Sequence, residues 1–185
     1  MRGINWKAAL AFAAAISLVG GLALGELKTG QKAPDFTITT LDGKDFKLKP
    51  LVSKGKEQKA VVAIAFWGTW CPPCRAEAPH LQKLHAKYGK QGLAMIGIAV
   101  ADAPRMVRRF ADDNKLTYTL AVDSSQAPVA AKYGVLDKDG MLHVPQLFIV
   151  DGSGTLRYHH LGYAMGSEKT LEREIKELLA EKPKP

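Results

Sequence analysis

The chain has 185 residues, a formal net charge of +8 and a hydrophobic fraction of 46%. A folded part of about 160 residues buries roughly 70% of its unfolded surface, so a hydrophobic core can stabilise it without structural disulfides. The Lys and Arg residues are scattered, with neither a dense basic run nor interleaved aromatic residues, and this pattern argues against nucleic-acid binding.

The first 25 residues differ in composition from the rest of the chain. Arg2 and Lys7 precede an apolar stretch, residues 8–24, and a basic start before an apolar segment is typical of exported proteins. The stretch is slightly long for a signal peptide and slightly short for a membrane span. We therefore expect residues 1–25 to form a cleaved signal peptide or a membrane anchor, and residues 26–185 to form one domain.

The elements of this domain follow from periodicity and turn signals. Alternating residues around Asp42-Gly43 predict a β-hairpin over 34–48, followed by a loop over 50–59. The apolar runs 60–66 and 93–100 have the length of buried central strands. We also expect a helix from about 71 to 88, a helix over 103–113 capped by Asp102, a strand over 118–122, a short helix over 127–133, strands over 145–150 and 155–163, and a helix capped by Ser167. This order predicts an α/β sheet with helices on both faces.

Both cysteines lie in the sequence WGTWCPPCRAEAP, where a buried strand passes into a helix. The helix N-terminus carries partial positive charge, which stabilises a thiolate at Cys71. Cys74 lies one turn further on, within disulfide range, and is the expected resolving thiol. Pro72 and Pro73 occupy early helical positions, where a missing N–H costs little, and they stiffen the turn. A disulfide that closes so short a loop stabilises a fold little, so the pair predicts a redox centre.

Glu77 follows the cysteines on the same expected helix. Helical periodicity places it in the middle of the apolar stripe formed by Leu81, Leu84 and Tyr88. Burial disfavours the charged form, so we expect the pKa of Glu77 to rise toward neutrality. Glu77 is three residues from Cys74, close enough to take the thiol proton directly or through water. We therefore predict that Glu77 is the acid–base partner of Cys74.

The stretches AFWGTWCPPCRAEAP, QKAPDFTITTLDGK and VPQLFIVDGSGTLRYHHLGY resemble thioredoxin-fold disulfide oxidoreductases of the TlpA/ResA type, over about residues 31–181. The resemblance implies a thioredoxin fold with a central mixed sheet and an N-terminal β-hairpin extension. It also implies a cis proline, Pro145, beside the cysteines, which leaves the Val144 backbone free to pair with an extended substrate. Trp70 is expected at the rim of this site as substrate contact area, and Trp67 in the core.

The resemblance also implies a function. These proteins reduce disulfides of exported proteins, among them apocytochrome c before haem attachment, and no cofactor is expected. The resemblance places the chain in the periplasm or on the extracytoplasmic face of the membrane, with a membrane thiol-reductant donor as its partner. Two features depart from the family. Ala65 stands where thioredoxin has a buried aspartate, and the segment before Pro145, YGVLDKDGMLHVPQ, is longer than usual.

Two other functions fit parts of the pattern. A copper-delivery protein of this fold would bind metal through the cysteine pair and a nearby histidine, but such proteins prefer three residues between the cysteines. The candidate histidines are His80, His85 and His143, whereas the adjacent His159 and His160 point to opposite faces of a strand and are expected to be structural. A peroxiredoxin-like peroxidase expects threonine three residues before its cysteine, where this chain has Gly68.

Overall fold

The computed structural model of the protein describes residues 27–52 and 61–181. The apolar stretch 8–24 lies outside these residues, and with it the expected signal peptide or anchor. Within the described residues, no helix combines the length and the apolar character that crossing a bilayer requires.

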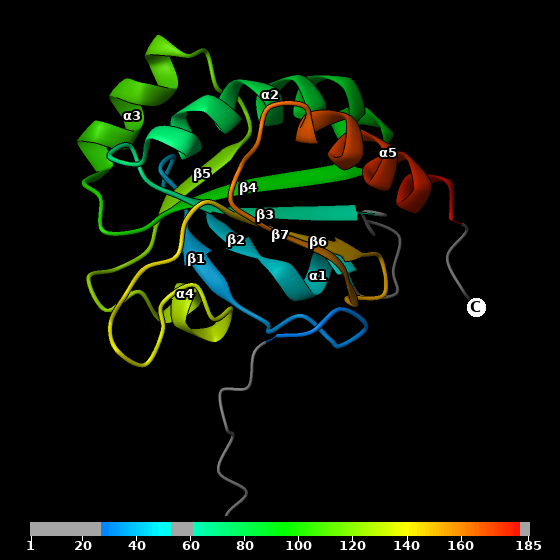
Figure 1. The fold of residues 1–185 in the computed structure, drawn as a ribbon, viewed down its shortest axis with the longest axis horizontal. Coiled ribbons are helices and arrows are strands. Elements are labelled where there is room, and N and C mark those ends of the chain that lie inside the picture. The colour runs from blue at the N-terminus through cyan, green and yellow to red at the C-terminus, as the bar shows by residue number, and fades with distance from the viewer. Residues whose placement is uncertain (1–26, 53–60, 182–185) are drawn as a thin grey trace, which may run out of the picture.

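Five strands form the central sheet, in the order β5-β4-β3-β6-β7. β4 and β5 run parallel to β3, whereas β6 pairs antiparallel with both β3 and β7, so the sheet is mixed, as expected. All seven residues of β3 are buried, because this strand lies in the middle of the sheet with helices on both faces (Figure 1). The strands are β3 (Val61–Trp67), β4 (Leu93–Ala99), β5 (Thr119–Val122), β6 (Gln146–Asp151) and β7 (Leu156–Leu161).

Two apolar cores lie on the two faces of this sheet. One face is covered by α2 (Pro72–Tyr88), α3 (Pro104–Asp113) and α5 (Ser167–Ala180), with the short 3₁₀ turn Gly89–Gln91 after α2. The other is covered by α1 (Leu48–Val52), α4 (Pro128–Lys132) and the hairpin of β1 (Thr37–Thr39) and β2 (Asp45–Lys47). The hairpin forms its own sheet and is tied to β5 by the Leu41 N–H, which donates to the Leu120 carbonyl at 2.7 Å. The thioredoxin-like fold with its hairpin extension is therefore confirmed.

Three local expectations were wrong. Leu48–Val52 forms the helix α1 rather than the end of a strand and a loop, because Leu48, 1% exposed, packs into the second core. Asp102 is not the N-cap of α3: Ala103 holds that position without a side-chain bond, and Pro104 begins the helix. Ser167 is likewise the first residue of α5 rather than its cap, a position taken by Gly166 with a φ of 94°.

Candidate active site

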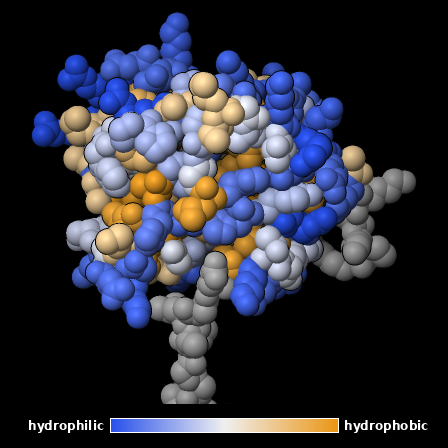
Figure 2. Space-filling view, in the orientation of Figure 1, coloured by the Kyte–Doolittle hydropathy of each residue, from blue (hydrophilic) through white to orange (hydrophobic). Residues whose placement is uncertain are grey.

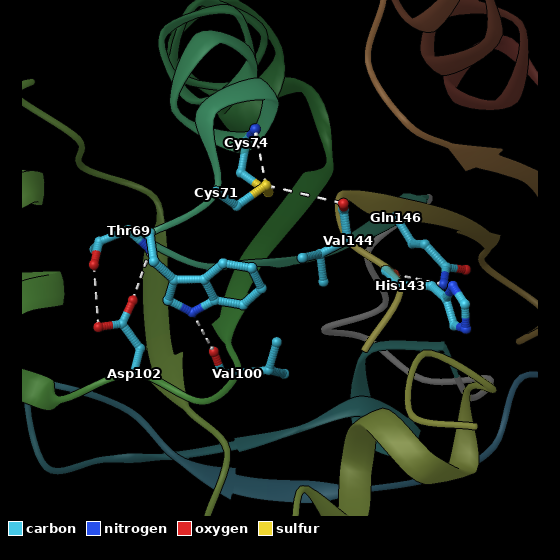
Figure 3. Close-up of a disulfide and its surroundings, with 9 residues drawn as sticks. Thr69, Cys71, Cys74, Val100, Asp102, His143, Val144 and Gln146 are labelled. Carbon is cyan, nitrogen blue, oxygen red and sulfur yellow. Dashed lines mark hydrogen bonds between the residues drawn. A yellow bond between two sulfur atoms is a disulfide. The ribbon is translucent and has the colours of Figure 1, made fainter. Parts of the chain in front are cut away.

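The two cysteines form a disulfide where β3 passes into α2. Cys71 is the N-cap residue of α2, and its Sγ accepts a hydrogen bond from the Cys74 backbone N–H at 3.3 Å (Figure 3). The sulfur atoms are 2.09 Å apart and the Cα atoms 5.3 Å. The Cys74 N–H has no partner within the helix and points at the Cys71 sulfur, together with the partial positive charge of the helix N-terminus. This arrangement stabilises a thiolate at Cys71 once the disulfide is reduced.

A segment about seventy residues further along the chain brings Val144 and Pro145 to this disulfide. The Val144–Pro145 peptide bond is cis, and the Val144 carbonyl oxygen lies 3.9 Å from the Cys71 Sγ (Figure 3). Two hydrogen bonds fix this segment: Gly162 N–H donates to the Pro145 carbonyl at 2.8 Å, and Gln146 Nε2 donates to the His143 carbonyl at 2.7 Å. The proline that the resemblance implied beside the cysteines is found there, in the cis form.

Trp70 stands at the rim of the disulfide, with 51% of its surface exposed. Its indole Nε1 donates to the Val100 carbonyl at 3.2 Å, which holds the ring in place. Gly68 makes room for this ring, because a Cβ at position 68 would lie 2.6 Å from the indole nitrogen. Trp67, by contrast, is 3% exposed and packs in the core.

Replacing Gly68 with alanine is therefore expected to displace the Trp70 indole and break its bond to Val100. Since Trp70 is exposed at the rim, we expect altered tryptophan fluorescence and weaker capture of a protein substrate, while a small disulfide reagent is reduced at nearly the normal rate. Stopped-flow fluorescence and substrate kinetics on Gly68→Ala, with Trp70→Phe for comparison, measure both effects. A Gly68→Ala protein with unchanged fluorescence contradicts the assigned steric role.

Thr69 and Asp102 make a contact that the sequence did not indicate. The Asp102 carboxylate accepts from the Thr69 backbone N–H at 2.7 Å and from its hydroxyl at 3.1 Å, and also from the Ala103 N–H at 2.9 Å (Figure 3). These bonds tie the turn before Cys71 to the start of α3. Asp102 thus holds the active-site turn instead of capping the helix. A contact between residues so far apart in the chain cannot be predicted from the local sequence pattern.

Glu77 is buried on α2, one turn beyond Cys74, and only 4% of its surface is exposed. Burial raises the pKa of its carboxyl group to about 7. Among the described residues, none donates a hydrogen bond or forms an ion pair to this carboxylate. The expected burial and the raised pKa are both found.

The histidines considered as metal ligands are held apart by other partners. His143 Nε2 lies 2.8 Å from the Asp137 carboxylate, within the long segment before Pro145. His80 stacks on Tyr163, and His85 packs against the edge of Tyr118. In the part of the chain that the structure describes, no three His, Cys, Asp or Glu side chains are grouped to hold a metal ion.

His159 and His160 point to opposite faces of β7, as the strand periodicity predicted. His159 stacks on Phe148 with ring centroids 4.3 Å apart, and its Nε2 lies 2.7 Å from the Gln146 side-chain oxygen. His160 turns to the other face and bonds the Glu174 carboxylate at 2.7 Å. Gln146 therefore links His159 to the carbonyl of His143, beside the active-site proline.

A thioredoxin-like sheet with a vicinal cysteine pair at a helix N-terminus, facing a cis proline, defines a thiol-disulfide oxidoreductase of thioredoxin fold. The chain belongs to the AhpC/TSA family, which residues 29–159 match. The thiol-disulfide oxidoreductase ResA of Bacillus thuringiensis (strain Al Hakam) is 34% identical over 123 residues, which are 62% of this chain and 67% of that protein.

Solved structures give the same class. A Chlorobium tepidum structure described as a thiol:disulfide interchange protein DsbE superposes with a TM-score of 0.71 at 27% identity, over 83% of this chain and 99% of that one. A secreted disulfide oxidoreductase of Mycobacterium tuberculosis superposes with a TM-score of 0.62 at 26% identity, over 77% of this chain and 95% of that one.

Proposed function

We propose that this oxidoreductase reduces disulfide bonds of exported proteins on the extracytoplasmic side of the cytoplasmic membrane. The observation that carries the proposal is the Cys71 sulfur, which lies at the N-terminus of α2 and 3.9 Å from the Val144 carbonyl. In the reduced protein, the Cys71 thiolate attacks a substrate disulfide, forms a mixed disulfide and releases one substrate thiolate. Cys74 then attacks the Cys71 sulfur, so that the second substrate thiolate leaves and the Cys71–Cys74 disulfide forms.

Glu77 is proposed as the acid–base partner in the second step. It lies one helical turn from Cys74, is buried, and has a pKa of about 7. A carboxylate with that pKa is matched to accept a thiol proton at neutral pH, and no aspartate competes for this role from position 65, which is Ala65. Pro72 and Pro73 stiffen the turn that presents both sulfur atoms.

The substrate is proposed to lie across Trp70, Val144 and Pro145. Large apolar side chains are exposed around this end of the sheet: Trp70 precedes the disulfide, Met106 lies in the first turn of α3, and Leu161 pairs with the residue after Pro145. Figure 2 shows apolar side chains gathered across the middle of the face turned toward the viewer. An apolar rim of this kind suits a protein chain whose own apolar residues are still accessible, as in an exported protein before folding, with apocytochrome c as one candidate.

The location is proposed from the N-terminal composition. A basic start followed by the apolar residues 8–24 supports export, with residues 1–25 as signal peptide or anchor and 26–185 as the redox domain. The similarity to a secreted Mycobacterium tuberculosis oxidoreductase supports the same side of the membrane. A reductase working there needs electrons from a membrane thiol-reductant donor, which we propose as its partner.

The peroxidase alternative is disfavoured by the space around Gly68. That chemistry expects a threonine three residues before the reactive cysteine. A threonine at position 68 would have to displace Trp70, because even a Cβ would lie 2.6 Å from the indole nitrogen. The Trp70 ring occupies the volume that such a side chain would need.

The Cys74→Ala variant is expected to accumulate Cys71 mixed disulfides with its natural substrates, since no second thiol remains to resolve them. Affinity purification from cells after acid quenching, followed by mass spectrometry, identifies the attached proteins. The Cys71→Ser/Cys74→Ala double variant is the control and should trap nothing. A captured set made only of cytoplasmic proteins contradicts the proposed location and substrate class.

A further inference from the structure

A second feature of the molecule is a cavity between α2, β7 and α5, which adjoins the proposed substrate rim at Leu161. A cavity of about 430 Å³ is lined by Glu77 from α2, by His159, His160 and Leu161 from β7, by Tyr163 from the following loop, and by Ser167 and Leu171 from α5. α2 and α5 lie side by side on one face of the sheet, and the chain from β7 to α5 passes over them (Figure 1). The cavity thus brings Glu77, the proposed acid–base group, together with groups of β7 and α5.

The Glu77 carboxylate is a buried polar group without a protein partner among the described residues, although only 4% of its surface is exposed. Buried polar groups are ordinarily hydrogen-bonded to protein or to water. Glu77 is a wall residue of the cavity. Water in the cavity would supply the hydrogen-bond partner that the described residues do not.

His160 connects this cavity to the surface. Its Nε2 lies 2.7 Å from the carboxylate of Glu174, whose side chain is 7% exposed, whereas the His160 side chain is 28% exposed. The imidazole therefore lies between a buried carboxylate and bulk solvent while lining the same cavity as Glu77. An imidazole can accept a proton on one ring nitrogen and release one from the other, so it suits a relay.

The other titratable groups around Glu77 and the cavity suit a relay less well. They are Cys74 and His80 on α2, Tyr118 before β5, Tyr163 after β7, and Glu168 and Glu174 on α5. Burial raises the pKa of Tyr118 and of Tyr163, so both phenols hold their protons at neutral pH. His80 stacks on the Tyr163 ring. His159 also lines the cavity, but its ring stacks on Phe148 and its Nε2 is held by the Gln146 side chain.

We propose that this cavity is the proton port of the redox centre, and that His160, oriented by Glu174, relays the proton between Glu77 and solvent. The inference rests on the proposed acid–base role of Glu77. The Cys74 thiol gives its proton to the Glu77 carboxylate, the Cys74–Cys71 bond forms, and the bond from Cys71 to the substrate sulfur breaks with its electron pair on the leaving thiolate. Glu77 then releases the proton through the cavity and His160, which resets it for the next turnover.

The test uses the reduced full-length protein and 5,5′-dithiobis(2-nitrobenzoate), whose thiolate product is coloured. The first release follows attack by Cys71, and the second follows resolution by Cys74, so the two steps are seen separately. The experiment is run in dilute buffer near pH 6, where most Glu77 carries a proton that it must release before it can accept that of Cys74. Under these conditions we expect His160→Gln to leave the first phase unchanged and to slow the second about tenfold. Added imidazole should restore the second phase to within about twofold, because a small base can replace the missing relay.

Glutamine is chosen because its amide N–H can still donate to Glu174. If the single variant does not fold, His160→Gln combined with Glu174→Gln keeps a hydrogen-bonded pair without either titratable group and takes its place. His85→Gln is the matched control, since it removes an imidazole from α2 away from the cavity, and both its phases should match the wild type.

Each outcome decides one of the two claims. A second phase that is unaffected in His160→Gln overturns the proton port while leaving the role of Glu77 standing. A slow second phase that imidazole does not restore also overturns the relay and makes His160 a structural residue only. If Glu77→Gln itself leaves the second phase unchanged, the proposed acid–base role fails, and the proton port fails with it.

Discussion

The Cys71→Ser variant is expected to lose disulfide reduction altogether. Cys71 is the N-cap of α2, and its sulfur receives the Cys74 N–H at 3.3 Å, so the thiolate stabilised by the helix terminus is the one that must attack. A serine hydroxyl in its place is not ionised at neutral pH and is a far weaker nucleophile. We expect a fall in rate of at least about a thousandfold, measured with a protein disulfide substrate and with the coloured reagent.

The matched variant is Cys74→Ser, which keeps the nucleophile and removes only the resolving thiol. It should show the first coloured release at a near-normal rate and no second release. Alkylation at mildly acidic pH should label the remaining thiol faster in Cys74→Ser than in Cys71→Ser, because the helix terminus acts on Cys71. Equal labelling of the two variants would contradict the assignment of Cys71 as the more acidic thiol. Disulfide reduction by Cys71→Ser would contradict its assignment as the nucleophile.

Much of the fold could be predicted because its signals are local. The uninterrupted apolar runs of β3 and β4 mark strands buried on both faces, and the burial of Glu77 followed from its place in the apolar stripe of α2. The Cys71–Cys74 spacing likewise fixed a disulfide at a helix N-terminus without any tertiary information. These features depend on side chains within a few residues of one another.

The parts that sequence reasoning missed depend on contacts between distant segments. Asp102 was predicted to cap the helix because it precedes an apolar-periodic stretch. Its carboxylate instead accepts the backbone N–H of Thr69, in the turn before Cys71. Leu48–Val52 carries no strong helical signal, and packing of Leu48 against the sheet decides its conformation. The position of Pro145 beside Cys71 came from the family resemblance alone. The cavity that joins Glu77 to His160 exists only once α2, β7 and α5 are assembled.

Glu77 should make the oxidised protein less stable as the pH rises. Its carboxyl has a pKa of about 7 in the folded protein and 4.5 as its ordinary value, so between these limits the folded state binds more protons than the unfolded state. The contribution of neutral Glu77 to the free energy of unfolding is fully present below about pH 4.5, and it is lost as the pH rises through about 7. The loss is roughly 3 kcal/mol. Denaturant unfolding of the wild type and of Glu77→Gln across this range should show the slope only in the wild type, with the exposed Glu177→Gln as control.

The same substitution is expected to slow resolution of the mixed disulfide by on the order of a hundredfold, because glutamine cannot accept the Cys74 proton. In the wild type the second coloured release should accelerate with rising pH through about 7, as Glu77 ionises and becomes able to accept a proton. Glu77→Gln should lack this step and keep only the dependence that comes from the thiol itself, while the first release, which reports on Cys71, stays within a few-fold of normal. A stability slope that vanishes in Glu77→Gln while the second release is unchanged would make Glu77 a buried core acid with no part in catalysis. Loss of both together identifies the buried carboxyl as the group that couples folding stability to the redox step.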